Sequence, residues 1–391
     1  MKKFDVCIIG GAGHIGLPLG LLISSKNKRV ILYDKNIEVI NKINKGIMPF
    51  LEIGATKLLL KNKKKIFATD DIKYVQSAKI VIVCIGTPVT ATLKPNLKFF
   101  FQLFKELKSY IKKDQTIIIR SSIYPGTCEK IFTILGKGFK NISYCPERVV
   151  QGKSIEELPK LPQIVSGYSK KSILVSKNLF KLICKKVIIT SVLEAELVKL
   201  FSNAWRYINF SVSNEFLMIC ENHNINFSKL RKTMIDGYER NRDIPLAGFA
   251  AGPCLFKDTV QLSAFLRNNF TLGKAATTIN ENLPNFLLKK LKEKYHSKLK
   301  YKTVGILGLA FKAEIDDDRD SLSIKLIKIL KRNKIKLIIS DEYIKHPQGV
   351  TKEKLIKSAD IIIIATPHKA YKKIKFPKNK EVIDTWGLIE R

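Results

Sequence analysis

Short apolar runs and amphipathic stretches alternate along residues 1–190 of the chain. The apolar runs have the length of strands, and the amphipathic stretches have the spacing of helices. The strand-like runs occupy 4–9, 29–33, 78–85, 115–120 and a short 141–143, and the helical stretches occupy 16–24 and 97–110. Strands that alternate with helices form parallel sheets covered on both faces. The pattern therefore predicts a Rossmann-like N-terminal domain over residues 1–190.

The pattern changes after residue 190. Apolar residues recur at helical spacing from 193 to 221 without Gly or Pro, which predicts one long helix. A further helix is predicted from after Gly273 to Lys294, with a break or a kink at Pro284, and strand patterns return at 302–307, 335–340 and 360–365. We therefore predict an α/β fold. Two Rossmann-like parallel-sheet domains, at 1–190 and 297–391, are joined by the long central helix and a helical dimerisation domain at 191–296.

Composition narrows the class of protein. Hydrophobic residues make up 45% of the 391 residues, which suffices for several cores. No apolar segment reaches the roughly 20 residues that span a bilayer, and no N-terminal stretch has the pattern of a secretory signal. Seven cysteines without C-x-x-C spacing indicate neither a disulfide framework nor a metal site. We expect a cytoplasmic protein with no membrane partner and no metal.

The charge balance is strongly basic, with a net charge of +36 from 70 basic and 34 acidic residues. Such an excess favours an acidic partner or simply reflects solvated lysines. The sequence has no helix-turn-helix, zinc-finger or aromatic–basic RNA motif, so we expect no nucleic-acid partner. A phosphorylated substrate is compatible with the positive electrostatic field of such a chain.

A glycine motif joins the first predicted strand to the first predicted helix. Gly11, Gly13 and Gly16 form a G-x-G-x-x-G that also contains Ile15. In this motif the glycines allow a tight turn, a close approach to a pyrophosphate and tight helix–strand packing. Asp34 follows the second strand, where a carboxylate binds ribose hydroxyls and disfavours a 2′-phosphate. The motif therefore predicts a dinucleotide site for NAD.

A second motif surrounds Cys254, which follows a run of small residues and begins a predicted helix. A thiol at a helix N-terminus lies in positive partial charge, which favours the thiolate. Asp258 is one turn further along the same face, within reach of a water beside the thiol. The alternative is a structural cysteine beside an ordinary Lys-Asp pair. Lys199 and Asn203 share one face of the long helix and could hold an oxyanion, or they could be incidental surface residues.

Two loops follow later strands of the first domain, at 121–127 and 144–148. Ligands bind at the carboxyl ends of strands in open parallel sheets. Glu147 is therefore a candidate acid–base group. Its alternative role is a surface ion pair with Arg148.

Taken together, the motifs resemble those of the UDP-glucose/GDP-mannose dehydrogenase family, the nucleotide-sugar 6-dehydrogenases, over nearly the whole chain. The matching positions are Gly11 to Gly16, Ser121 to Thr127, Cys145 to Arg148, the E-x-x-K-L-x-x-N of Glu196 to Asn203, the C-x-x-K-D of Cys254 to Asp258, and the C-terminal Gly308, Phe311, Lys312, Asp317, Arg319 and Ser321. Six motifs in order are far more specific than any one of them.

The resemblance implies roles for individual residues. Cys254 would be a covalent nucleophile, Lys199 and Asn203 would stabilise oxyanions, Asp258 would order water, and Glu147 would assist acid–base steps or hydrolysis. The cofactor site would include Thr87, Thr127 and Arg319, and the substrate site would include Lys257, Lys312 and either Arg240 or Arg242. The C6 alcohol of a nucleotide-linked hexose, such as UDP-glucose or a UDP-N-acetylhexosamine, would pass through a thiohemiacetal and a thioester to the uronate as two NAD are reduced.

Departures from the family pattern concern the two catalytic loops. Ala250 and Ala251 stand where the family has glycines before the nucleophile, which places the identity of the hexose in doubt. Arg120 stands where an acidic residue often precedes the Ser-Thr pair. Two rival functions stay open: an ordinary two-electron hydroxy-acid or 3-hydroxyacyl dehydrogenase, and a non-catalytic nucleotide-binding scaffold.

Overall fold

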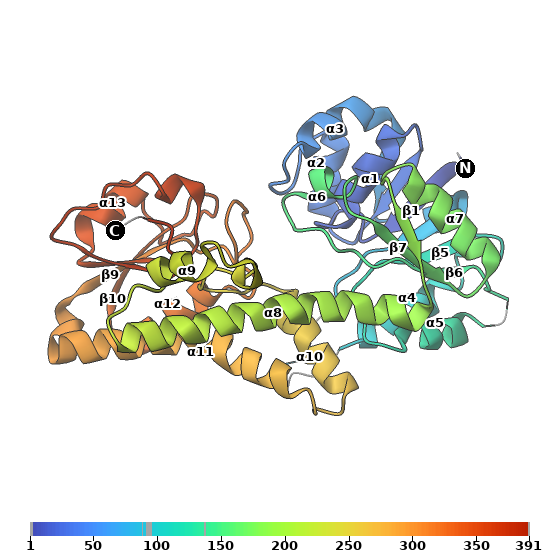
Figure 1. The fold of residues 1–391 in the computed structure, drawn as a ribbon. Helices are drawn as coiled ribbons and strands as arrows, with labels where there is room; N and C mark the ends of the chain where they lie inside the picture. The colour runs from blue at the N-terminus through green and yellow to red at the C-terminus, as the bar shows by residue number, and fades with distance from the viewer. Residues whose placement is uncertain (1–2, 88, 91–95, 137, 390–391) are drawn as a thin grey trace. The chain divides into compact units, whose positions relative to one another are not determined.

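The computed structural model describes residues 3–87, 89–90, 96–136 and 138–389 (Figure 1). The chain forms two compact units that divide between Ser202 and Asn203. The division falls inside α8 (Val192–Asn222), a single helix of 31 residues. The predicted long helix at 193–221 is therefore confirmed to within one residue at each end. The finer division into three domains stays a prediction.

The first unit is built on an eight-stranded sheet in the order β3-β2-β1-β4-β5-β6-β7-β8. Its strands are β1 (Phe4–Ile9), β2 (Val30–Tyr33), β3 (Ile66–Thr69), β4 (Ala78–Val83), β5 (Thr116–Ile119), β6 (Ile142–Tyr144), β7 (Gln163–Gly167) and β8 (Val187–Ile189). The pairs from β3 to β6 are parallel, as predicted, whereas β7 runs antiparallel to β6. The order reverses between β1 and β4, so the ligand-binding crevice of such a sheet is expected beside β1.

Helices cover both faces of this sheet, and most residues of its central strands are apolar and buried. One face packs on α1 (Gly16–Ser25), α2 (Ile37–Lys45), α3 (Ala55–Asn62) and α7 (Lys170–Lys181). The other face packs on α4 (Lys98–Leu107), α5 (Thr127–Leu135) and the first turns of α8 (Figure 1). A single turn, α6 (Ser154–Glu157), lies between β6 and β7 in the chain.

The second unit contains a four-stranded parallel sheet in the order β10-β9-β11-β12. Its strands are β9 (Thr303–Leu307), β10 (Lys336–Ser340), β11 (Ile361–Ile364) and β12 (Glu381–Asp384). Its helices, besides the rest of α8, are α9 (Phe227–Ile235), α10 (Leu255–Phe265), α11 (Thr271–Tyr295), α12 (Leu322–Arg332) and α13 (Lys352–Ser358). Strands β9 to β11 share one hydrophobic core with α8, α11 and α12, so the helical segment and the small sheet stabilise each other.

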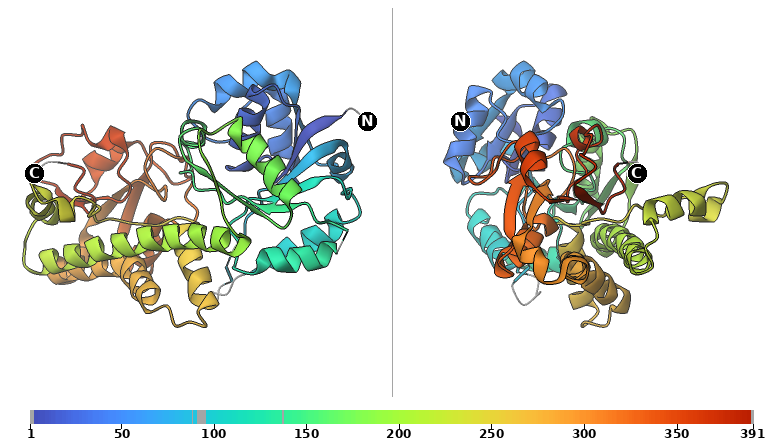
Figure 2. Two further views of the ribbon diagram at one scale, coloured as in Figure 1. Left: turned by 45° about the vertical axis from the view of Figure 1, so that its right-hand side comes forward. Right: turned by 90° about the vertical axis from the view of Figure 1, so that its left-hand side faces the viewer.

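Helix α11 is unbroken at Pro284, where a break or a kink was expected. The helix continues through the proline to Tyr295, and Figure 2 shows it alongside the second half of α8. Leu283, Pro284 and Leu287 are buried in the shared core. Burial of this face offsets the backbone hydrogen bond that the proline cannot donate. None of the described helices is long and apolar enough to cross a bilayer.

Candidate active site

The loop between β1 and α1 has the geometry of a pyrophosphate cradle. A Cβ at Gly11 would lie 2.6 Å from the Leu32 Cα, and a Cβ at Gly16 would lie 2.2 Å from the Gly10 carbonyl oxygen. Glycine is required at these two positions by the protein's own packing. A Cβ at Gly13 would meet nothing closer than 3.4 Å, so the open space there is available to a ligand.

The N-terminus of α1 faces this loop without a side-chain cap. Ile15 occupies the N-cap position and offers no hydrogen-bonding side chain, and the first turn contains no acidic residue. The positive end of the helix dipole favours a phosphate anion there. These residues fit the pyrophosphate of a dinucleotide.

Asp34 stands at the end of β2, as predicted, and is tied to the glycine loop. One carboxylate oxygen accepts the Ala12 N–H at 3.2 Å, and the other accepts the Asn36 N–H at 3.2 Å. The carboxylate is half-buried at the rim of the loop. A fixed acid in this place can accept hydrogen bonds from an adenosine ribose and repels a 2′-phosphate, which favours NAD over NADP.

Loops at the ends of β4 and β5 meet beside this cradle. The Thr87 hydroxyl donates to the Ser122 carbonyl oxygen, and the Thr127 hydroxyl donates to the Tyr124 carbonyl oxygen. Both threonines are buried, at 3% and 1% exposure. Neighbouring parallel strands therefore bring the two predicted cofactor residues to the same edge of the sheet.

Glu196 fixes this loop to α8, a connection that sequence reasoning did not assign. Its buried carboxylate accepts the Gly126 N–H at 2.7 Å and the Cys128 N–H at 3.0 Å, and so caps the N-terminus of α5. Burial raises the pKa of Glu196, and the two backbone donors lower it in part. Lys199 follows one helical turn later, is 8% exposed, and has no carboxylate within ion-pair distance among the described residues of the first unit.

Glu147 is buried at the end of β6 and pairs with Arg120 rather than with the Arg148 side chain. Its proposed alternative role as a surface ion pair is therefore wrong. The Arg120 Nε donates to the Glu147 Oε2 at 2.9 Å, and Nη2 donates to the same oxygen. The Arg148 guanidinium instead donates to the Pro162 carbonyl oxygen.

Cys254 is the exposed thiol of the chain, and all seven cysteines lie within the described residues. It occupies the N-cap position of α10 with no side-chain cap, so the thiol lies at the positive end of the helix dipole. Burial raises the pKa of Cys7, and it raises the pKa of Cys84 and of Cys145 to about 12. Burial also raises the pKa of Cys128 and of Cys220, and Cys184 is buried at 6% exposure. Cys254 is therefore left as the candidate nucleophile.

Asp258 lies one turn after Cys254 and is fully buried. Its Oδ2 accepts the Asn203 side-chain N–H at 2.6 Å, and the Lys257 ammonium forms an ion pair with Oδ1 at 3.0 Å. The structure thus brings together three residues that the sequence placed on two separate helices. One of the two N–H donors of the Asn203 amide is engaged by Asp258, so the amide keeps a second N–H donor.

A buried amide network holds the loop that leads to Cys254. The Asn214 Oδ1 accepts the Gly248 N–H at 2.7 Å, and its Nδ2 donates to the Asn280 Oδ1 at 2.8 Å. The Asn280 Nδ2 in turn donates to the Tyr207 carbonyl oxygen at 3.0 Å. Both asparagines are 0% exposed, so α8 and α11 together fix the start of the nucleophile loop.

Two aromatic rings pack against glycines of the nucleophile loop, defined here as residues 248–254. A Cβ at Gly248 would lie 2.3 Å from the Trp386 ring, and a Cβ at Gly252 would lie 2.4 Å from the Phe311 ring. Gly252 has a φ of +102°, which side-chain-bearing residues rarely adopt. The positions that retain glycine here are therefore those where the backbone touches a ring.

The remaining predicted site residues of the second unit occupy two regions. Arg319 pairs with Asp317 at 2.5 Å; this hydrogen bond raises the pKa of Arg319, and the nearby Cys254 thiol raises it further. Lys312 is half-buried in the same loop, directly after Phe311. Arg240 and Arg242 are instead exposed on a short turn after α9, with Arg242 3.6 Å from the Glu239 carboxylate.

The small sheet repeats the glycine-loop design with one difference. Asp341 follows β10 as Asp34 follows β2, and its Oδ2 accepts the Leu309 N–H at 2.5 Å and the Ala310 N–H at 3.2 Å. The buried His368 side chain lies 3.2 Å from the same oxygen. Burial alone would raise the pKa of Asp341, but the His368 and Leu309 hydrogen bonds lower it to about 2. The difference from Asp34 is the contact with this buried histidine, since the hydrogen-bond donors to Asp34 described above are the N–H groups of Ala12 and Asn36.

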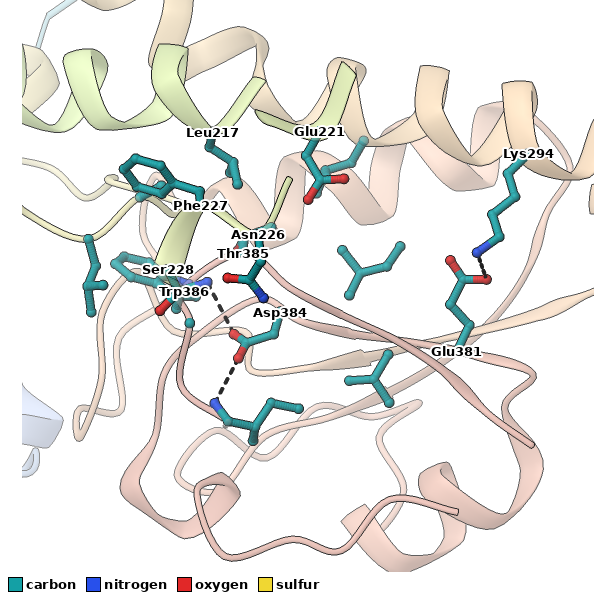
Figure 3. Close-up of a pocket in the computed structure, with 17 residues that line it drawn as sticks. Leu217, Glu221, Asn226, Phe227, Ser228, Lys294, Glu381, Asp384, Thr385 and Trp386 are labelled. Atoms are coloured by element: carbon teal, nitrogen blue, oxygen red, sulfur yellow. Dashed lines mark hydrogen bonds and ion pairs between the residues drawn. The ribbon is translucent and has the colours of Figure 1, made fainter. Parts of the chain in front are cut away.

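The second unit contains a cavity of about 280 Å³ whose lining includes Ala247, the residue directly before the nucleophile loop (Figure 3). Its lining combines the end of α8, the start of α9 and the edge strand β12, and includes Leu217, Phe227, Ala247 and Trp386. Of these, the Trp386 ring packs against Gly248 at the start of the nucleophile loop. The described residues contain no group of three or more His, Cys, Asp or Glu side chains that could hold a metal ion.

Comparison with known proteins shows which protein family the chain belongs to. Sequence models of the UDP-glucose/GDP-mannose dehydrogenase family match three consecutive parts: the NAD binding domain at residues 4–184, the central domain at 193–282 and the UDP binding domain at 305–391. The chain belongs to the UDP-glucose/GDP-mannose dehydrogenase family. It is an NAD-dependent oxidoreductase, and the glycine loop of its first unit lies in the NAD binding domain.

Relatives of this family resemble the chain over almost its full length. A UDP-N-acetyl-D-mannosamine dehydrogenase of Pyrococcus horikoshii is 29% identical, covering 97% of this chain and 95% of that protein. A UDP-glucose 6-dehydrogenase of Rickettsia bellii is 26% identical over 97% and 93%. A solved UDP-N-acetylmannosamine dehydrogenase structure from Pyrococcus horikoshii has a TM-score of 0.91 at 28% identity and covers 99% of this chain and 96% of that chain.

Proposed function

We propose that the chain oxidises the C6 hydroxyl of a UDP-linked hexose to the carboxylate in two successive NAD-dependent steps. The observation that carries this proposal is the exposed Cys254 thiol at the start of α10, above the buried Asn203–Asp258 pair. A two-electron dehydrogenase has no need of a nucleophilic thiol. A four-electron oxidation needs one, because an aldehyde cannot release a hydride until a nucleophile has added to it.

The reaction balances as follows. The alcohol loses a hydride and a proton to give an aldehyde, and the Cys254 sulfur then bonds to the aldehyde carbon. This thiohemiacetal loses a second hydride and proton and becomes a thioester. Water adds to the thioester carbon, the carbon–sulfur bond breaks, and the carboxylate leaves with the thiol restored. NAD bound on the first unit supplies the hydride acceptor, once for each oxidation.

Each oxygen anion on this path needs a donor. We assign the Lys199 ammonium and the Asn203 amide to the oxyanions, in line with their positions on one face of α8. Asp258 is assigned to orient the hydrolytic water, and Glu147 to assist the acid–base steps. The mechanism requires the thiol of Cys254 and the ammonium of Lys199 to reach the same carbon atom.

We propose UDP-N-acetyl-D-mannosamine as the sugar, with UDP-glucose as the second candidate. The first is supported by the 29% identical Pyrococcus horikoshii enzyme and the second by the 26% identical Rickettsia bellii enzyme. The UDP group would bind the C-terminal part, where the UDP binding domain matches and where Lys312 lies. The seven free cysteines suit a reducing compartment, so we place the reaction in the cytoplasm.

We further propose a homodimer through α8. Phe201, Trp205, Val212 and Ile219 are 54%, 66%, 40% and 52% exposed and follow each other at intervals that align on one helical face. An exposed apolar stripe of this length on a helix marks a protein interface. A second copy of the same helix offers a matching stripe, as two-fold symmetry requires.

A panel of UDP- and GDP-sugars with NAD, read by NADH absorbance and product analysis, tests the function. We expect two NADH for each sugar converted to its acid. Cys254→Ala should lower the rate by at least about a hundredfold, the effect of losing a positioned catalytic group, whereas Cys220→Ser, a control thiol in the same unit, should not. One NADH per product, or unchanged turnover in Cys254→Ala, would refute the four-electron mechanism.

A further inference from the structure

Arg120 is one of the most deeply buried charged residues of the first unit, at 1% exposure. Its Nη1 donates to the Cys145 carbonyl oxygen at 3.1 Å and to the Gln163 Oε1 at 2.8 Å, and its guanidinium lies 4.8 Å from the centre of the Phe180 ring. Gln163 begins β7, which runs antiparallel to β6 and so starts at the edge where β5 and β6 end. Arg120 therefore joins the ends of three strands at the carboxyl edge of the sheet.

The carboxylate of Glu147 accepts hydrogen bonds from four N–H donors. Its Oε2 accepts both Nε and Nη2 of Arg120, and its Oε1 accepts the N–H groups of Arg148 at 2.7 Å and Val149 at 3.0 Å. A carboxylate offers about four lone-pair positions, and four donors point at this one. A proton on either oxygen would meet an N–H group, so this environment suits an acceptor and not a proton donor.

The same edge carries the predicted cofactor residues. The Arg120 and Ser121 N–H groups both donate to the Val83 carbonyl oxygen, and the next residue, Ser122, accepts the Thr87 hydroxyl. The guanidinium that holds Glu147 is thus attached to the backbone that positions Thr87. A change at Arg120 would be transmitted to Glu147 by direct contact.

We propose that Arg120 is a positioning residue for the oxidation, which fixes the Glu147 carboxylate beside the cofactor edge so that it takes part as a hydrogen-bond acceptor and not as a hydrogen-bond donor. This inference rests on the proposed function, because it narrows the acid–base role assigned to Glu147. It also explains why a basic residue is accommodated before the Ser121–Ser122 pair: the base has a buried acidic partner, 27 residues later in the chain.

The rival explanation is that the pair only stabilises the fold. A buried ion pair can often be replaced by neutral residues of similar volume with little loss of stability, whereas removal of one partner is strongly destabilising. The variant Arg120→Met with Glu147→Gln replaces both charges and keeps the volumes. A purely structural pair predicts that this double variant regains activity as it regains stability.

The experiment compares Arg120→Met, Arg120→Lys, Glu147→Gln and the double variant in kcat, in KM for NAD and in unfolding midpoint. We expect the double variant to fold like the wild type but to keep a kcat at least about tenfold lower, with KM for NAD changed less than about threefold. Arg120→Lys should retain more kcat than Arg120→Met. A double variant with kcat within about twofold of the wild type overturns the proposal.

A second readout does not depend on activity. Hydrogen exchange of the Arg148 and Val149 amides should be faster in Arg120→Met than in the wild type, because the carboxylate that accepts them is no longer held. Unchanged exchange of these two amides would overturn the proposal that Arg120 holds the Glu147 carboxylate in place. A wild-type chain that oxidises no nucleotide sugar refutes the proposed function instead, and the exchange result then decides the role of Arg120 as the residue that fixes Glu147.

Discussion

The contact between Gly252 and the Phe311 ring makes a quantitative prediction about the nucleophile loop. The change Gly252→Ala places a Cβ 2.4 Å from Phe311 Cδ2, where an ordinary carbon–carbon contact needs roughly 3.5 Å. Overpacking of this kind costs about 1–3 kcal/mol. The φ of +102° adds about 1–2 kcal/mol for a residue with a Cβ. We therefore expect the free energy of unfolding of the second unit to fall by about 2–5 kcal/mol.

The two tryptophans of the chain offer a direct assay. Trp205 and Trp386 both lie in the second unit, so tryptophan fluorescence, excited where tyrosine does not absorb, reports on that unit during guanidinium unfolding. Gly237→Ala is the matched control, because Gly237 also has a positive φ, +65°, but a Cβ there would meet nothing within 4 Å. The control should lose about 1–2 kcal/mol, the backbone contribution without the clash.

A further change separates the clash from the backbone strain. Phe311→Ala in the Gly252→Ala background removes the ring that the new methyl group strikes, so the double variant should be less destabilised than the sum of the two single changes. Purely additive losses would refute the argument from the ring. Gly252→Ala as mild as Gly237→Ala would refute it as well.

Four further variants test the glycine loop, the Asp341 carboxylate and the exposed face of α8. Gly13→Ala should weaken NAD binding at least about tenfold by calorimetry. It should leave the melting temperature nearly unchanged, because the new Cβ has no contact closer than 3.4 Å. Gly16→Ala should instead destabilise the fold itself, because its Cβ would lie 2.2 Å from the Gly10 carbonyl oxygen. Asp341 has a pKa of about 2 in the folded chain, below its ordinary value, so its contribution of about 2 kcal/mol to the free energy of unfolding is present above pH 4 and is lost as the pH falls from 4 towards 2. The free energy of unfolding of Asp341→Asn, measured by fluorescence, should therefore depend less on pH over that window. An unchanged pH dependence would contradict the assignment. Trp205→Glu places a charge in the exposed stripe of α8 and should yield a monomer in sedimentation, whereas a dimer that survives would exclude this face.

Eight of the twelve described strands, but only five of the thirteen described α-helices, were predicted from local patterns. Strand β1 has the predicted bounds because a run of buried apolar residues ends at two glycines. Helix α8 was predicted to within a residue because it contains no Gly or Pro and its apolar spacing is regular. Of the break or kink expected at Pro284, the break was wrong, because tertiary burial of the proline's neighbours outweighs the lost hydrogen bond. The direction of β7 could not be predicted, since local pattern does not encode which way a strand runs.

The candidate site was predictable only in part. Cys254, Asp258 and Asn203 could be chosen by motif and residue type, and the structure joins the last two by a hydrogen bond. The Asn214–Asn280 pair gave no signal, because a polar residue on a helix is read as facing solvent until its partner is known. The sequence does contain a weak signal for Arg120. This residue directly follows three apolar isoleucines of a buried strand, which indicates that its guanidinium is buried and needs a partner.

The two ring contacts of the nucleophile loop limit how the enzyme can be redesigned. Residues 248 and 252 are held by aromatic side chains that come much later in the chain, at 386 and 311, so a library that randomises the whole loop would mostly produce unfolded variants. Phe249, Ala250 and Ala251 lie between these two fixed points. Phe249 is itself buried in the core of the second unit, so diversity confined to Ala250 and Ala251, with Phe249 and both glycines retained, offers a route to variants that accept a different sugar while Cys254 stays in place.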